Sequence, residues 1–264
     1  MIKNILIALF FLSILPTYSQ ILNVDRENVE DTLKKKLNYF VTLNFSNDKQ
    51  KKNLIDLATQ TEIDLFFKNN YFLLALVQTD FAINGNVLNE NNGYFQVRYR
   101  DNDTRKYSLD FYSQFQWNNI QGLENRFLNG INARINLFEK KKSDLFFSIG
   151  SFYEIENWNT SMTGYAYSDS INQKVRRDFF RLNTSAKFAI KISDKIDFAG
   201  TSYLQFPINN YFNKPRWYID SKLFFNVSNR LNFVFHYNQN LDFYRALPID
   251  SFYYSISLGI NIKF

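Results

Sequence analysis

The stretch FYYSISLGINIKF, residues 252–264, alternates between two kinds of side chain. Every second residue, from Phe252 to Phe264, is aromatic or aliphatic, whereas most of those between them are serine, glycine, asparagine or lysine. Successive side chains of a β-strand point to opposite faces of a sheet. This stretch therefore predicts a strand with one apolar face and one polar face.

The same alternation recurs in earlier segments. They are residues 36–46, 53–67, 71–82, 93–101, 106–117, 123–138, 144–155, 177–192, 195–206, 215–227 and 231–243. The pattern is weakest in 71–82, because apolar residues occupy both faces there. Many segments exceed the length of about five or six residues usual in soluble sheets, and suit tilted membrane-crossing strands. We therefore predict an all-β fold, a transmembrane antiparallel up-and-down β-barrel of 12 strands, with 10 or 14 strands as alternatives.

The connections between these segments alternate in length. The longer ones are the odd connections at residues 82–92, 156–176, 207–215 and 244–250. Long outer loops and short inner turns are typical of bacterial outer-membrane barrels, so we expect both termini in the periplasm and lipids of the outer membrane around the barrel. The terminal Phe264 resembles the signal read by the barrel-assembly machinery, which we expect as a partner.

The N-terminal 19 residues predict a secretory signal peptide. Lys3 precedes an apolar run that is too short to span a bilayer, and small residues stand before a cleavage point at Gln20. We expect residues 20–35 to form a short periplasmic segment and residues 36–264 to form the barrel. Whether the segment 20–35 lies beneath the barrel or plugs it stays open.

The composition excludes several classes of protein. Without cysteine the chain has no disulfide, no thiolate metal site and no lipoprotein anchor. An aromatic content of 19% does not fit disorder. The net charge of +6 is too small to favour binding to nucleic acid.

The polar face of the predicted strands carries acidic and basic residues in equal numbers. The candidates for lining the lumen are Arg98, Arg100, Asp110, Gln114, Arg126, Arg134, Glu154, Arg181, Lys187, Asp220, Lys222 and His236. One interpretation is that salt bridges between strands fill a narrow lumen. The other is a local arginine track that selects a solute. That track would consist of Arg98, Arg100, Arg126 and Arg134, with Asp110 and Gln114 as partners.

His236, the only histidine, raises the question of catalysis. Ser255 and Ser257 share its predicted face, but Asp242 lies about 20 Å away along the same extended strand. No Gly-x-Ser-x-Gly elbow occurs in the sequence. We therefore expect a hydrogen-bonded lumenal histidine, with no catalytic residue, no cofactor and no metal site.

Several motifs resemble a known family. They are Ile21–Asp25, Asn91-Asn92-Gly93-Tyr94, Phe115-Gln116-Trp117, Gly122-Leu123-Glu124-x-Arg126-x-Leu128-x-Gly130, Arg134 and Phe152-Tyr153-Glu154. The chain resembles the salt-induced outer-membrane proteins, domain of unknown function 481, although Asn132 stands where such proteins often have glycine. The resemblance implies an outer-membrane β-barrel of Gram-negative bacteria, here of a Bacteroidetes type, and implies no activity.

These observations predict a small channel or a structural envelope protein with a mixed-charge lumen. One alternative is an accessory subunit of an outer-membrane complex. It would bind a small solute or a protein partner through the loop 156–176, with Trp158, Tyr165 and Tyr167 as contacts. A less favoured alternative is an outer-membrane lipid- or peptide-hydrolase that uses His236.

Overall fold

The described residues of the computed structural model cover most of the predicted barrel. They are 37–49, 53–67, 71–84, 87–101, 106–140, 143–162, 174–208, 212–228, 230–244, 246–247 and 251–263. The predicted signal peptide, the segment 20–35, Tyr165, Tyr167 and Phe264 lie outside the described residues.

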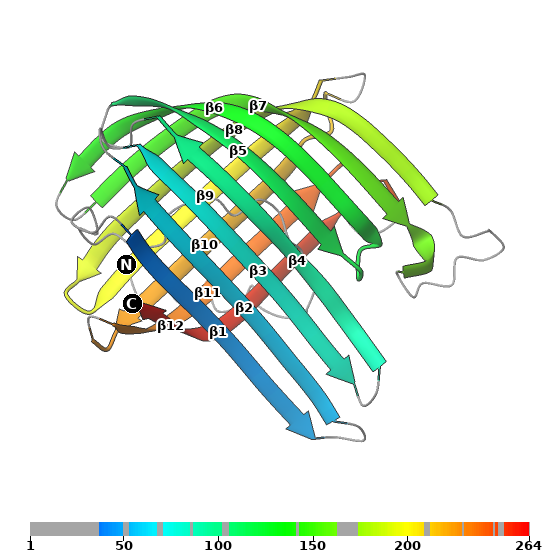
Figure 1. Ribbon diagram of the computed structural model, residues 1–264, viewed down its shortest axis with the longest axis horizontal. Coiled ribbons are helices and arrows are strands. Elements are labelled where there is room, and N and C mark those ends of the chain that lie inside the picture. Colours follow the sequence, from blue (N-terminus) through cyan, green and yellow to red (C-terminus); the bar gives the residue numbers. More distant parts are fainter. Residues whose placement is uncertain are drawn as a thin grey trace, which may run out of the picture.

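Twelve strands in the described residues form one closed barrel (Figure 1). They are β1 (Leu37–Lys49), β2 (Asn53–Phe66), β3 (Phe72–Asn84), β4 (Val87–Arg100), β5 (Tyr107–Asn118), β6 (Leu123–Lys140), β7 (Ser143–Asn159), β8 (Lys174–Ser193), β9 (Ile196–Pro207), β10 (Arg216–Asn226), β11 (Leu231–Asp242) and β12 (Phe252–Lys263), with one short 3-10 helix, η3 (Thr160–Met162). Each strand pairs antiparallel with its neighbours in sequence, and β1 pairs with β12. The prediction of a twelve-stranded up-and-down barrel is confirmed.

The barrel has its apolar face outside and its polar face inside. On β5, Leu109 and Phe111 are 40% and 46% exposed, whereas the alternating residues Asp110 and Gln114 are 2% and 1% exposed. A water-soluble barrel would have its polar face outside and its apolar face inside. A closed barrel with an apolar outer face is stable only when lipid surrounds it. The fold is therefore a transmembrane β-barrel. Among the described residues, no helix is long and apolar enough to cross a membrane.

Strand β3 resolves the ambiguous segment 71–82. Phe72, Leu74 and Leu76 point inward and are at most 2% exposed, while Val77 is 40% exposed on the outer face. The inward Phe72 ring lies 5.4 Å from the guanidinium carbon of Arg100. An aromatic ring on the lumenal face thus stabilises a buried cation. An alternation of polar and apolar faces does not predict such an inward apolar residue.

Two predicted loop boundaries are wrong. Strand β3 continues to Asn84 and β4 begins at Val87, so the expected loop 82–92 is mostly strand. Residues 89–92 of β4 are polar at every position, and hydrophobic periodicity therefore does not mark them as part of a strand. Strand β7 likewise continues to Asn159, so the first residues of the expected loop 156–176 belong to the barrel wall.

Candidate functional site

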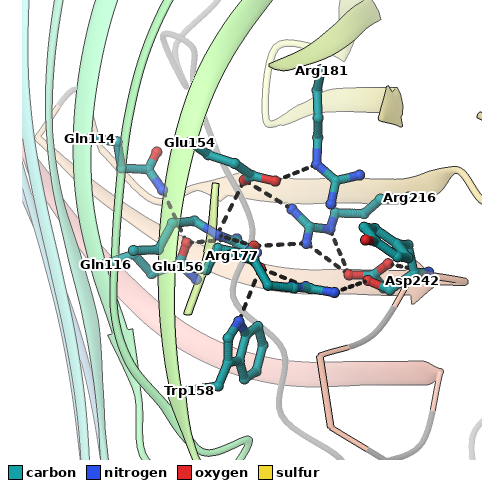
Figure 2. A network of polar contacts seen from close by, with 11 residues as sticks. Gln114, Gln116, Glu154, Glu156, Trp158, Arg177, Arg181, Arg216 and Asp242 are labelled. Carbon is teal, nitrogen blue, oxygen red and sulfur yellow. Dashed lines mark hydrogen bonds and ion pairs between the residues drawn. The ribbon is translucent and has the colours of Figure 1, made fainter. Parts of the chain in front are cut away.

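A network of ion pairs crosses the lumen at one end of the barrel (Figure 2). We call the end away from Leu37 and Lys263 the distal end; β7 and β11 finish there, and β6, β8 and β10 begin there. The distal network consists of Arg126, Glu154, Glu156, Arg177, Arg181, Arg216 and Asp242. These residues come from five different strands, which the closed barrel brings together.

Glu156 of β7 is one centre of the distal network. Its Oε1 lies 2.9 Å from Nε of Arg126 and 3.2 Å from Nη2 of Arg216. Its Oε2 accepts hydrogen bonds from Nη2 of Arg177 at 2.6 Å and from Nε1 of Trp158 at 3.0 Å. One carboxylate therefore holds three guanidinium groups and an indole.

Glu154 and Asp242 complete the distal network. Nε of Arg181 donates to Oε1 of Glu154, and Nη1 of Arg216 lies 3.5 Å from Oε2 of the same carboxylate. Nη2 of Arg216 also lies 2.8 Å from Oδ2 of Asp242 on β11. Arg216 on β10 thus contacts carboxylates on β7 and β11. Since β8 and β9 separate β7 from β10 along the sheet, its bonds to β7 run across the lumen.

The distal network is almost fully buried. The side chains of Glu154, Glu156 and Arg181 are 0% exposed and that of Arg216 is 1% exposed, whereas Arg177 and Asp242 reach 12% and 13%. Charged groups so far from water are held in place only when each finds a partner, because desolvating an unpaired charge costs several kcal/mol. Four guanidinium groups face three carboxylates, which gives a formal balance of 4 − 3 = +1.

A layer of four aromatic side chains and one leucine adjoins the distal network inside the barrel. We call Tyr112, Leu128, Phe152, Tyr203 and Tyr218 the aromatic layer. They form one cluster and are 1–4% exposed. The rings of Tyr203 and Tyr218 are 6.2 Å apart, and the cluster draws on β5, β6, β7, β9 and β10. The cluster thus joins inward side chains from strands between β5 and β10, so buried side chains occupy the lumen at this level.

Gly130 on β6 makes room for the aromatic layer. A Cβ atom at Gly130 would lie 2.4 Å from Cζ of Tyr112 and 2.7 Å from Cβ of Phe152, closer than van der Waals contact. We expect Gly130→Ala to lower the free energy of unfolding by about 1–3 kcal/mol, because overpacking forces both side chains to shift. Urea unfolding of the barrel refolded into lipid vesicles measures this. The neighbouring Asn129→Ala, on the outer face, is the control and should change the value by less than about 1 kcal/mol. Equal unfolding midpoints for both variants would contradict the role of Gly130.

Polar pairs occupy the lumen nearer the termini. Asp110 lies 2.6 Å from Nε of Arg100 and 3.3 Å from Nη1 of Arg98. The guanidinium carbon of Arg134 is 3.7 Å from the centre of the Phe146 ring.

Further round the barrel, Nζ of Lys222 on β10 lies 3.4 Å from Oε1 of Gln60 on β2. Lys187 on β8 is also buried, at 8% exposed. Charged side chains of both signs therefore line the lumen outside the distal network as well.

The residues after β11 fold over the distal network. We call residues 243–244 and 246–247 the cap segment. Leu247 is 4% exposed and packs with Leu123 and Trp158. The carbonyl oxygen of Tyr244 accepts a hydrogen bond of 3.1 Å from Nη1 of Arg177. Arg177 therefore connects the cap segment to the distal network.

The arginines of the track, the second of the two interpretations of the sequence, are divided between different environments. Arg126 belongs to the distal network, whereas Arg98 and Arg100 share Asp110. Arg134 lies over an aromatic ring instead. Gln114 was expected to pair with the track, but it accepts from Gln96 at 2.9 Å and donates to Gln116 at 3.2 Å. These arginines therefore line no continuous path.

The lumen-lining candidates predicted from sequence omit four of the seven members of the distal network, namely Glu156, Arg177, Arg216 and Asp242. Arg177 and Arg216 share the strand parity of Arg181 and Asp220, so parity alone could have placed them on the lumenal face. Glu156 was missed because the predicted loop began there. The expected loop contact Trp158 is also inside the barrel, 5% exposed and bonded to Glu156, so it is not available as an external contact.

His236 has an acidic partner on the neighbouring strand. Its Nε2 lies 2.6 Å from Oδ2 of Asp220, so the ring is hydrogen-bonded inside the lumen and its partner is a carboxylate other than Asp242. Ser255 accepts a hydrogen bond of 2.7 Å from Asn238, and Ser257 lies opposite His236 in the β11–β12 register. A serine-directed base would use the Nε2 that Asp220 already contacts. Within the described residues, no group of three His, Asp or Glu side chains could hold a metal ion.

No family model and no curated protein sequence matches this chain. Among solved structures, the NanC porin matches with 12% identity and a TM-score of 0.47, covering 86% of this chain and 98% of that chain. The β domain of the Bordetella autotransporter Brka matches with 9% identity and a TM-score of 0.46, covering 87% and 99%. The translocator domain of the autotransporter NalP from Neisseria meningitidis matches with 11% identity and a TM-score of 0.45, covering 86% and 87%. At these identities and TM-scores the likeness does not inform function.

Proposed function

We propose that this protein is a non-conducting structural barrel of the outer membrane, whose lumen is closed by its own side chains. The observation that carries the proposal is the distal network: its ion pairs cross the lumen and leave Glu154, Glu156 and Arg181 without exposure to solvent. In an open pore, charges on the wall face water and do not pair across the lumen. The aromatic layer supplies a second closure in series with the first.

The proposed membrane placement follows from the faces and connections of the barrel. The exposed apolar exterior supports contact with lipid, and a β-barrel exposed to lipid on this scale is typical of a bacterial outer membrane. Three distal connections, 160–173, 208–215 and 243–251, are longer than proximal turns such as 194–195. Long loops are typical of the extracellular side, so we assign the distal end to the outside and both termini to the periplasm. Assembly would then require the barrel-assembly machinery.

The proposal assigns no catalytic step to the barrel. His236 is the residue on which a hydrolase would depend, and its Nε2 is engaged by Asp220. The geometry favours a structural hydrogen bond within the lumen, which agrees with the other polar pairs around it.

Solute uptake into vesicles tests the closed lumen. Liposomes that contain the folded wild-type barrel should swell in isotonic glycine or arabinose no faster than protein-free liposomes, because the two closures leave no aqueous path. A swelling rate that rises in proportion to the amount of protein would contradict the proposal and favour the channel interpretation.

A further inference from the structure

Arg181 has hydrogen-bond donors that the protein does not use. Its side chain is 0% exposed, and its Nε donates to Glu154. Its Nη1 and Nη2 are buried without a hydrogen-bond partner. Buried cationic donors are costly to leave without an acceptor, so these two groups can accept a further hydrogen-bond partner.

The excess positive charge of the distal network also favours an additional anion beside Arg181. Its four guanidinium groups exceed its three carboxylates by one. Figure 2 shows the guanidinium groups of Arg181 and Arg216 near one another, and the like charge of Arg216 acts on Arg181. A further negative charge beside Arg181 would relieve this repulsion and give the network a balance of zero.

The network can be approached from the distal side. Arg177 and Asp242 are its most exposed members, at 12% and 13%, whereas Glu154 and Glu156 are 0% exposed. Nε of Arg177 is likewise buried without a hydrogen-bond partner. The route therefore passes Arg177 and the cap segment that it holds through the carbonyl of Tyr244.

We propose that the distal network binds a small anion bearing a carboxylate or phosphate group, with Nη1 and Nη2 of Arg181 as its principal donors. The planar guanidinium fork offers two parallel donors, which match the paired oxygens of a carboxylate or phosphate. Arg177 and Arg216 supply further positive charge at the same place. This binding site goes beyond the structural role and does not depend on whether the barrel conducts.

Trp158 provides a reporter inside the distal network, because its Nε1 donates to Glu156. The other two tryptophans, Trp117 and Trp217, bond to Asn91 and Ser202 and can be replaced by phenylalanine. In that background, sodium phosphate and sodium acetate are titrated separately into the folded protein in detergent, with chloride keeping the ionic strength constant. We expect a saturable change of Trp158 fluorescence. Saturation by phosphate alone, by acetate alone or by both supports the site and identifies the group that it accepts.

Matched variants on β8 decide whether Arg181 is responsible. We expect Arg181→Gln to raise the half-saturating concentration at least about tenfold, because charge-assisted hydrogen bonds are lost. Arg176→Gln, on the exposed outer face of the same strand, should leave it unchanged. Folding is checked by the mobility of unheated samples on gels. If Arg181→Gln does not fold, Arg181→Lys takes its place, and it should also weaken binding because lysine lacks the paired donors.

Two results would overturn the proposal. One is no change, or only a linear change, of Trp158 fluorescence with both anions in the wild-type background. The other is a saturable change that keeps the same half-saturating concentration when Arg181 is replaced by glutamine or lysine.

Discussion

Replacing Glu156 with glutamine is expected to lower the free energy of unfolding of the barrel by about 3–5 kcal/mol, because breaking a buried ion pair leaves an uncompensated charge. Glu156 holds Arg126, Arg177 and Arg216 at once, so a neutral amide leaves three buried cations with too little negative charge. Glutamine has nearly the volume of glutamate, so the effect reports charge and not packing. Urea unfolding in lipid vesicles of fixed composition measures the difference.

The control for this prediction is Glu124→Gln, which makes the same change of side chain in an ion pair at the surface. Glu124 lies 3.5 Å from Nζ of Lys174, whose side chain is 75% exposed. Exposed ion pairs contribute about 0–1 kcal/mol, so this variant should unfold close to the wild type. A Glu156→Gln variant that loses no more stability than Glu124→Gln would show that the distal network does not hold the barrel together.

Removing both closures of the lumen is expected to convert a silent barrel into a conducting one. Arg216→Ser removes the side chain that contacts all three carboxylates, and Tyr203→Ser with Tyr218→Ser opens the aromatic layer. Two barriers in series block flow until both are gone. The combined variant should therefore swell liposomes in glycine, whereas the Arg216 variant alone and the double tyrosine variant alone should not.

Two checks apply to these variants, one on their folding and one on which part of the lumen is closed. Each tyrosine removed from the core is expected to cost about 3–5 kcal/mol, so folding must be shown by gel mobility and by protease resistance before swelling is compared. If the Arg216 variant alone swells liposomes, the aromatic layer is not a closure. If the combined variant folds and stays silent, another part of the barrel closes the lumen.

The two faces of the barrel were predictable because lipid and lumen impose opposite demands on alternate residues. On β5, Phe111 and Asp110 fall where their parity predicts. The rule that inward residues are polar fails where an apolar side chain lies inside the lumen, as at Phe72 beneath Arg100. Parity also fails where both faces are polar, as in residues 89–92 of β4, so the predicted loop is too long and the predicted strand too short.

The pairing of side chains inside the barrel could not be predicted from one sequence. Parity places Arg216 and Glu154 on the inner face, but only the closed cross-section brings Nη1 of Arg216 to 3.5 Å from Oε2 of Glu154 across the lumen. For His236 the acidic partner was sought on its own strand at Asp242, whereas the neighbouring strand supplies Asp220. Strand parity specifies a face, and register together with barrel closure specifies the contacts on it.

The motifs that resemble the salt-induced outer-membrane proteins acquire physical roles in this barrel. Gly130 leaves space for Tyr112, and Arg126 and Glu154 belong to the distal network. Asn132, where a glycine was expected, is buried and accepts from Asn183, and the glycine that lies against it is Gly150 on the adjacent strand. The family assignment itself stays a prediction.

Electrical recording of the wild-type barrel in a planar lipid bilayer tests the closed lumen most directly. We expect a current that cannot be distinguished from that of the protein-free bilayer at either polarity, with insertion verified by recovering folded protein from the membrane. Uniform, stable conductance steps that appear in proportion to inserted wild-type protein would contradict it.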